Sequence, residues 1–161
     1  TTHMQEKHIN KNAYWQKITA YCVYQERCHK EVRDKLYTLG LHKNDVEQYI
    51  CRLIDENYLN EQRFAEQFAG GKFRNNQWGR QKIIYVLRQK NISTYCIDKA
   101  LQQINDAAYL NTLQNVACKK WDSMPKNIPI HLRKQKLIPY LLQKGYENEL
   151  IKKLISNLEN K

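Results

Sequence analysis

The chain has 161 residues, 42% of them hydrophobic, and carries 27 Lys and Arg against 16 Asp and Glu, a formal net charge of +11 at pH 7. This length allows a buried core, and the positive charge predicts an anionic partner, with nucleic acid the first choice. The sequence has neither an apolar run long enough to span a membrane nor the apolar segment of a secretory signal, so we expect a cytoplasmic protein without membrane contact.

Residues 1–11 are expected to form an N-terminal tail, and a first unit of three helices is predicted over residues 12–57. Val32 and Leu36 are one helical turn apart, and Gly40-Leu41 marks the turn that follows. The next stretch has apolar residues at positions i, i+3, i+4 and i+7, namely Val46, Tyr49, Ile50 and Leu53. This spacing predicts the buried face of a helix.

A second unit is predicted over residues 58–106. Asn60 is expected to cap its first helix, with Leu59 packing on Phe64 one turn later. Gly70 and Gly71 are expected to weaken this helix, so residues 72–76 are expected to form a frayed, basic end that leads into the next helix.

The next two helices of this unit are predicted from their apolar spacing. Trp78 and Ile83 occupy the two positions whose side chains clamp a helix entry, and the helix is expected to continue to Asn91. The helix after it has the same i, i+3, i+4, i+7 pattern as in the first unit, at Ile97, Ala100, Leu101 and Ile104.

The helical pattern recurs a third time, which predicts a third unit over residues 107–161. The pattern that starts at Val46 returns at Ile97 and at Ile151, at offsets of 51 and 54 residues, and Tyr58-Leu59-Asn60 returns as Tyr109-Leu110-Asn111. Pro139 falls inside a predicted helix of this unit, where it either kinks the helix or marks its true start. No strand pattern is present, so we predict an all-α protein of three tandem three-helix repeats in an elongated, curved array.

The charge differs between the three predicted units. Residues 12–57 carry seven basic and seven acidic side chains, residues 58–107 carry eight and four, and residues 108–161 carry ten and four. The first unit is therefore neutral, whereas the second and third are predicted to form a basic arm that binds polyanions in a salt-dependent way.

The stretch from Asn57 to Ile92 carries a series of short motifs. In order these are Asn57-Tyr58-Leu59-Asn60-Glu61, Arg63-Phe64-Ala65, Lys72-Phe73-Arg74, Trp78-Gly79-Arg80, Lys82-Ile83 and Asn91-Ile92. Together with Glu26-Arg27-Cys28 and Gly40-Leu41, they resemble the fingerprint of the RecX family, bacterial regulators of the RecA recombinase. The resemblance covers most of residues 14–104. Asn57 and Asn91 stand where the family has glycine, Asn60 where it has aspartate and Cys28 where it has serine. Because asparagine tolerates the left-handed backbone and caps helices, we expect the fold to be kept.

The resemblance implies a regulator of recombination, DNA repair and the SOS response that has no catalysis of its own. Such a protein binds the RecA filament on single-stranded DNA along its helical groove, and suppresses ATP hydrolysis and strand exchange by RecA. The implied partners are therefore the RecA filament and single-stranded DNA, with double-stranded DNA left open, and a monomer is expected.

Basic residues of the second unit are predicted to contact phosphate or the filament, and those of the third to extend the surface. They are Lys72, Arg74, Arg80, Lys82, Arg88, Lys119, Lys120, Arg133, Lys134 and Lys136. Trp78 can stack on an unpaired base or clamp its helix against Ile83, and the two roles are compatible. Arg63 is expected to be a surface or ion-pairing residue rather than a DNA contact.

Two other functions stay open on the residues alone. A helix-turn-helix transcription regulator could use Gln81, Arg88 and Gln89 on base edges, although three repeats do not predict a two-fold reader of half-sites. The second is a helical adaptor that binds another protein and whose positive charge is incidental to its function.

Motifs for catalysis and metal binding are missing from the sequence. It has no phosphate-binding glycine loop, no His-Glu-x-x-His and no Gly-x-Ser-x-Gly, so we expect no enzyme activity and no cofactor. Cys22, Cys28 and His29 lack the second paired cluster that zinc requires. Five scattered cysteines predict reduced thiols.

Overall fold

The computed structural model describes the backbone of residues 2–159 and the side chains of residues 11–158. Within these residues every regular element is an α-helix, and the helices follow one another in three groups. The first unit is α1 (Thr2–Tyr24), α2 (His29–Thr38) and α3 (Lys43–Asp55); the second unit is α4 (Glu61–Asn76), α5 (Arg80–Gln89) and α6 (Thr94–Gln102); the third unit is α7 (Asp106–Ser123), α8 (Ile130–Lys144) and α9 (Asn148–Glu159). The predicted all-α fold of three tandem three-helix repeats is confirmed.

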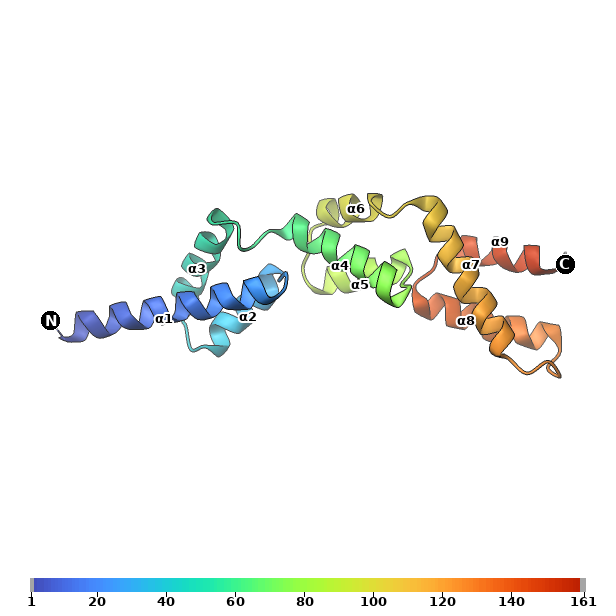
Figure 1. The fold of residues 1–161 in the computed structure, drawn as a ribbon, viewed down its shortest axis with the longest axis horizontal. Helices are drawn as coiled ribbons and strands as arrows, with labels where there is room; N and C mark the ends of the chain where they lie inside the picture. The colour runs from blue at the N-terminus through green and yellow to red at the C-terminus, as the bar shows by residue number, and fades with distance from the viewer. Residues whose placement is uncertain (1, 160–161) are drawn as a thin grey trace.

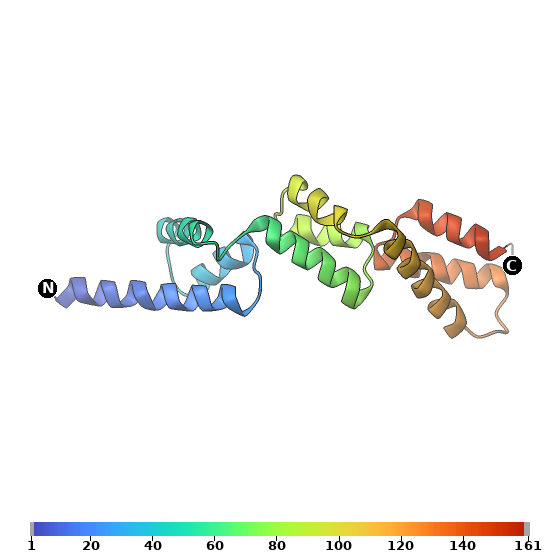
Figure 2. The same cartoon turned by 45° about the horizontal axis from the view of Figure 1, so that its top comes forward.

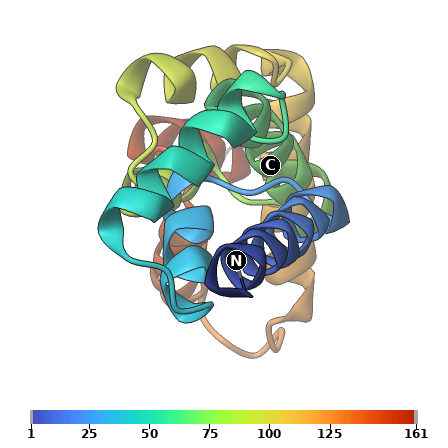
Figure 3. The same cartoon turned by 90° about the vertical axis from the view of Figure 1, so that its left-hand side faces the viewer.

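The three units are strung along one axis, with the two termini at opposite ends (Figure 1). α1 extends beyond α2 and α3 at the N-terminal end, which Figures 1 and 2 both show. Viewed from that end the units overlap, because they follow each other along the same axis (Figure 3). α1 begins at Thr2, inside the stretch expected as a tail, and residues 2–24 contain neither glycine nor proline to stop the helix.

Two separate apolar cores hold the array together. The first core lies within the first unit and is made of Ile18, Cys22, Val32, Leu36, Val46, Ile50, Leu53 and Leu59. The second core runs through both of the other units, from Phe64 on α4 to Ile151 on α9, and its large, fully buried members include Ile83, Leu87, Tyr109, Leu137, Leu141 and Tyr146. The second and third units are therefore one packed body, and the first unit has a core of its own.

Side-chain caps fix where several helices start. Asn60 accepts a hydrogen bond from the Arg63 backbone N–H at 2.9 Å, and Asn105 accepts one from that of Ala108 at 3.0 Å. Asn57 and Asn91 adopt left-handed backbone angles, with φ of 62° and 60°. As expected, asparagine takes the role of glycine at both turns.

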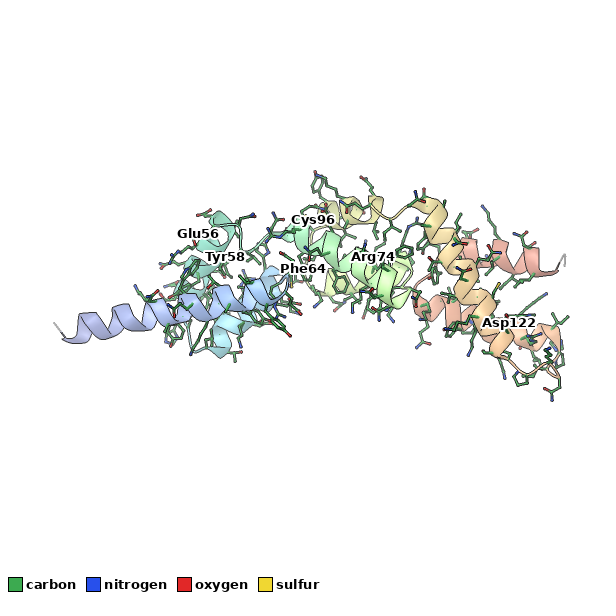
Figure 4. The ribbon with its side chains drawn as sticks, in the orientation of Figure 1. Glu56, Tyr58, Phe64, Arg74, Cys96 and Asp122 are labelled. Carbon is green, nitrogen blue, oxygen red and sulfur yellow. The ribbon has the colours of Figure 1, made fainter. Side chains whose placement is uncertain are left out.

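The second unit differs from its prediction in two places. α4 is a regular helix as far as Asn76, so Lys72 and Arg74 lie on a helix and not on a frayed end. Burial of Phe64, Ala65 and Ala69 on one face outweighs the low helix propensity of Gly70 and Gly71. The expected packing of Leu59 on Phe64 is wrong, because Leu59 belongs to the first core and Phe64 to the second. Figure 4 shows Tyr58 among the side chains of the first unit and Phe64 near the start of the second.

Two expectations for the third unit also change. Tyr109-Leu110-Asn111 lies inside α7, which is capped by Asn105, so it is not the structural equivalent of Tyr58-Leu59-Asn60. Tyr109 is instead fully buried. α8 runs from Ile130 through Pro139 without a break, which rules out a start near Pro139, since Leu137 and Leu141 anchor the helix on either side of the proline.

Candidate functional site

An aromatic ring between two lysines lies where α4 meets α5. The Nζ atoms of Lys72 and Lys82 lie 5.0 Å and 4.4 Å from the centre of the Trp78 ring, within the range of a cation–π interaction. The Phe68 ring packs edge-on against Trp78, with centroids 6.1 Å apart. We call Phe68, Lys72, Trp78 and Lys82 the Trp78 cluster.

Local structure explains why these four side chains meet. Phe68 and Lys72 are one turn apart on α4, so they share a face. The chain then reverses through Gln77, which adopts a left-handed φ of 53°, and the Trp78 backbone N–H donates to the Lys72 carbonyl at 3.2 Å. This short connector returns Trp78 to α4 and places Lys82 in the first turn of α5. Ile83 is buried in the second core and the partly buried Trp78 packs against that core, which is compatible with the expected clamp at the start of α5.

The cations of the Trp78 cluster are available to an anionic ligand. Among the described residues, neither Lys72 nor Lys82 forms an ion pair. Arg74 and Arg88, which were predicted to act with them, are exposed. Figure 4 places Arg74 near the middle of the array, where the second unit approaches the third. An uncompensated, partly desolvated cation binds phosphate more strongly than one already paired with a carboxylate.

Arg80 differs from the other predicted contacts because its charge is already neutralised. Its guanidinium lies 2.7 Å from the Asp106 carboxylate and 3.1 Å from that of Glu147, and it stacks on the Tyr109 ring at 3.8 Å. The Tyr109 hydroxyl donates to Glu147 and accepts from the Arg80 backbone N–H. Burial, together with the hydrogen bond to Glu147, raises the pKa of Tyr109 above its usual value. Arg80 therefore joins α5 to the third unit, and its geometry does not offer it to a phosphate.

The basic residues predicted in the third unit fall into two groups. Lys120 and Arg133 lie over aromatic rings: the Lys120 Nζ is 4.9 Å from the centre of Tyr140, and the Arg133 guanidinium is 4.1 Å from that of Trp121. Arg133 also donates to the Trp121 carbonyl at 2.7 Å. Of the remaining three, Lys119 and Lys136 are exposed and Lys134 is half-buried. The predicted residues are thus spread along α7 and α8 and do not gather at one point.

Arg63 forms an ion pair, as expected. Its Nε lies 2.6 Å from the Glu26 carboxylate, and its guanidinium also donates to the Asn57 and Tyr58 carbonyls. The pair with Glu26 ties α4 to the loop that follows α1, and the other two bonds tie it to the connector between α3 and α4. Arg63 is therefore part of the joint between the first two units.

No metal site is visible in the described part of the chain. Residues 11–158 contain no group of three or more His, Cys, Asp and Glu side chains placed to hold a metal ion. All five thiols are unpaired. Burial raises the pKa of Cys22 to about 11 and raises that of Cys28, so neither provides a thiolate at neutral pH. None of the described helices is long and apolar enough to cross a bilayer.

Two family models match the chain. One describes the second three-helix domain of RecX and covers residues 60–101; the other describes the third three-helix domain of RecX and covers residues 107–155. The chain belongs to the RecX family. These two matches cover the second and third units, the same helices that carry the Trp78 cluster and the basic residues of α7 and α8.

Relatives and solved structures agree with membership of the RecX family. Regulatory protein RecX of Streptococcus uberis is 30% identical over 138 residues, which make up 86% of this chain and 52% of the relative. The Clostridium perfringens protein of the same name is also 30% identical, over 81% of this chain and 61% of its own length. The chain thus spans about half to three-fifths of these relatives. A crystal structure of RecX from Lactobacillus salivarius has a TM-score of 0.82 at 25% identity and covers 93% of this chain and 97% of its own.

The sequence gives no local signal for the carboxylate partners of Arg80. Asp106 and Glu147 lie 26 and 67 residues away from it in the chain, so no local pattern joins them. The same is true of Lys90, whose Nζ lies 2.8 Å from the Glu31 carboxylate and 5.9 Å from the centre of the Phe68 ring. Burial alone would lower the pKa of Lys90, but the hydrogen bond to Glu31 and the negative charge of that carboxylate, together with smaller contributions from Cys28 and Tyr21, outweigh burial and raise the pKa. Lys90 and Glu31 are 59 residues apart, so this pairing has no local signal either.

Proposed function

We propose that this chain regulates a RecA recombinase by binding the RecA filament on single-stranded DNA and suppressing its ATP hydrolysis and strand exchange. Membership of the RecX family supports this proposal, since relatives carry the name regulatory protein RecX. The observation that carries it is the Trp78 cluster, in which Lys72 and Lys82 are held at the surface of an elongated, basic array without carboxylate partners within residues 11–158.

Physical reasons connect this surface to a filament. A filament on DNA offers a long groove lined with phosphate, and a rod of small units can follow such a groove where a globular protein would touch it at one point. Each lysine that neutralises a phosphate releases a counterion, so binding is expected to weaken as salt rises. Suppression then arises from occupying the filament, and the protein needs no catalysis of its own.

The proposed contact surface is Lys72, Arg74, Trp78, Lys82 and Arg88, extended by Lys119, Lys120, Arg133, Lys134 and Lys136. Arg80 is left out because its guanidinium is paired with Asp106 and Glu147. We propose that it acts by fixing the second unit against the third.

The test is the single-stranded-DNA-dependent ATPase activity of RecA from the same organism, with this protein titrated in at two salt concentrations. We expect a dose-dependent fall at less than one copy per RecA monomer, weaker at the higher salt. No effect on the ATPase, together with tight binding to one particular duplex sequence, would instead identify a transcription regulator.

A further inference from the structure

Each of the three units carries an aromatic ring flanked by two cations. In the first unit the Arg27 guanidinium is 3.8 Å and the Lys35 Nζ 5.5 Å from the centre of the Tyr21 ring. In the second unit the ring is Trp78. In the third unit Lys120 and Lys144 lie 4.9 Å and 6.0 Å from the centre of the Tyr140 ring. We call the first group the Tyr21 cluster and the last the Tyr140 cluster.

Lys90 joins the Tyr21 cluster to the Trp78 cluster. Its Nζ lies 2.8 Å from the Glu31 carboxylate of α2 and 5.9 Å from the centre of the Phe68 ring. Glu31 also lies close enough to Tyr21 to help raise the pKa of its hydroxyl, after burial, which is the main cause. The two clusters are therefore neighbours across the joint between α2 and α5.

Lys144 joins the Trp78 cluster to the Tyr140 cluster. Its Nζ lies 3.4 Å from the Asn76 carbonyl, at the end of α4, and its own carbonyl accepts a hydrogen bond from the Gly79 N–H at 2.8 Å. These two contacts are on either side of Trp78 in the chain. The three clusters thus form one connected row that passes from the first unit to the third.

The chemistry of the row suits a chain of phosphates. The basic and aromatic side chains of the three clusters are all half-buried, so their stems pack on the protein while the charged ends reach the surface. A ring that contacts two cations restricts the motion of both side chains, which lowers the entropy lost when they bind a ligand. Within residues 11–158, Arg27, Lys35, Lys72, Lys82 and Lys120 have no ion-pair partner.

We propose that one strand of single-stranded nucleic acid lies along this row and that its phosphates contact the Tyr21, Trp78 and Tyr140 clusters in turn. A single row of cations matches one phosphodiester backbone, whereas a duplex presents two. The first unit takes part through Arg27 and Lys35 although its formal charge is zero, because several of its carboxylates pair with other cations: Glu26 with Arg63, Glu31 with Lys90 and Glu47 with Arg33. This inference rests on the proposed binding of DNA in the filament, and adds where the strand runs.

The experiment compares two double variants of the first unit by fluorescence anisotropy with a labelled oligo(dT) strand. Arg27→Ala/Lys35→Ala removes both cations of the Tyr21 cluster. The matched control, Lys43→Ala/Arg52→Ala, also removes one lysine and one arginine, and its arginine likewise lies over an aromatic ring, Trp15 at 3.7 Å. Both control residues are on α3, which contributes nothing to the row.

Salt dependence provides the decisive readout. Losing two phosphate contacts lowers the slope of log K against log salt by about 1.4 for a single strand, so the affinity gap between wild type and Arg27→Ala/Lys35→Ala is expected to shrink roughly sevenfold between about 50 and 200 mM salt. The control is expected to keep the wild-type slope, and a duplex of the same length to compete less well than the single strand.

Equal slopes for the wild type and both variants would overturn the inference while leaving the proposed function intact. No binding of oligo(dT) by the wild type, with no effect on the RecA ATPase, would overturn both. Thermal unfolding shows whether each variant is folded. If the double variant is unstable, Lys35→Gln, which keeps Arg27, replaces it. Loss of one phosphate contact is expected to lower the slope by about 0.7.

Discussion

The two joints of the array are built from different interactions. The joint between the first and second units is mainly ionic: Glu26 pairs with Arg63 at 2.6 Å, and Glu31 pairs with Lys90 at 2.8 Å. Its buried apolar contribution is Cys28, which comes from the first unit and packs into the second core. Partly exposed ion pairs each contribute up to about 1 kcal/mol, and less as salt rises.

The joint between the second and third units adds backbone and aromatic contacts and a continuous buried core to the ion pairs of Arg80 with Asp106 and Glu147. The Gly79 N–H donates to the Lys144 carbonyl at 2.8 Å, and the Gln81 N–H donates to that of Gly145 at 2.9 Å. Tyr109 packs against Phe73 and Tyr146, with ring centroids 5.9 Å and 5.5 Å apart. This contact continues the second core without interruption.

The difference between the two joints predicts that the second and third units move as one rigid body and that the first unit is held more loosely. The second and third units cannot separate without opening a buried core, whereas the first unit can move at the cost of two ion pairs, the hydrogen bond from the Lys30 Nζ to the Gln89 carbonyl, and one buried cysteine. A protein of this kind can keep its basic surface fixed while it adjusts the first unit to a partner.

The largest effect is expected from Gly79→Ala. A Cβ at position 79 would lie 2.2 Å from the Gly145 carbonyl carbon and 2.3 Å from its oxygen, both backbone atoms that cannot shift without disturbing the joint. We expect a loss of about 3 kcal/mol in the free energy of unfolding, measured with urea. Gly71→Ala is the matched control: nothing lies within 4 Å of its Cβ, so it is expected to stabilise α4 by about 0.5–1 kcal/mol. Equal stability of the two variants would contradict the tight joint.

A smaller loss in the free energy of unfolding is expected from Arg80→Ala. It leaves the half-buried Glu147 carboxylate without its cation, which we expect to cost about 2 kcal/mol after allowance for solvent screening. Arg88→Ala, exposed on the same helix, is expected to change stability by less than about 0.5 kcal/mol. If Arg80→Ala has the same free energy of unfolding as Arg88→Ala but no longer binds DNA, the result would identify Arg80 as a DNA contact and contradict its structural role.

Alkaline pH is expected to weaken the joint between the second and third units. Burial raises the pKa of Tyr146 to about 12, and burial and Glu147 raise that of Tyr109. Each hydroxyl stays protonated in the folded protein, whereas in the unfolded chain it ionises above the ordinary tyrosine pKa of 10.0. Stability is therefore full below pH 10 and falls above it, by up to about 1.4 kcal/mol per pH unit for each tyrosine. Urea unfolding at pH 9, 10 and 11 measures this, and a constant free energy across that range would contradict the burial of the two hydroxyls.

The smallest effect is expected at the ionic joint. Glu26→Gln/Glu31→Gln removes both carboxylates, and we expect a loss of about 1 kcal/mol or less at low salt that disappears at high salt. Small-angle X-ray scattering should show a broader range of shapes in this variant. Glu56→Gln is the control, because its partner Arg52 belongs to the same unit, on α3. A wild-type scattering curve for the double variant would show that the joint does not depend on these pairs.

The helices were predictable because their causes are local. The apolar spacing around Val46, Ile97 and Ile151 and the cap at Asn60 each act over one or two turns, and all lie in helices or caps of the structure. The left-handed turns at Asn57 and Asn91 were expected for the same reason. The prediction for the end of α4 is wrong because burial of Phe64 and Ala69 outweighs the low helix propensity of Gly70 and Gly71.

The candidate site depends on side-chain pairing that is not local, so the sequence indicates only part of its geometry. Lys72, Trp78 and Lys82 are close in the chain, and the structure does bring them together. Arg80 could not be separated from them by sequence, since its partners Asp106 and Glu147 come from the third unit. The match of Tyr109 to Tyr58 failed because the same tripeptide caps a helix in one unit, whereas in α7 it lies within the helix and contributes one buried side chain, Tyr109.

The most direct test of the central claim is binding to a preassembled RecA filament on single-stranded DNA, measured by co-sedimentation of the wild type and two charge-reversal variants. Lys72→Glu/Lys82→Glu inverts the Trp78 cluster, whereas Lys43→Glu/Lys153→Glu makes the same change in net charge at exposed positions of α3 and α9. We expect the first variant to lose at least about tenfold in affinity with unchanged helical content, and the second to bind nearly as the wild type does. Equal affinity of the two variants would show that net charge, and not the Trp78 cluster, governs binding, and would contradict the account.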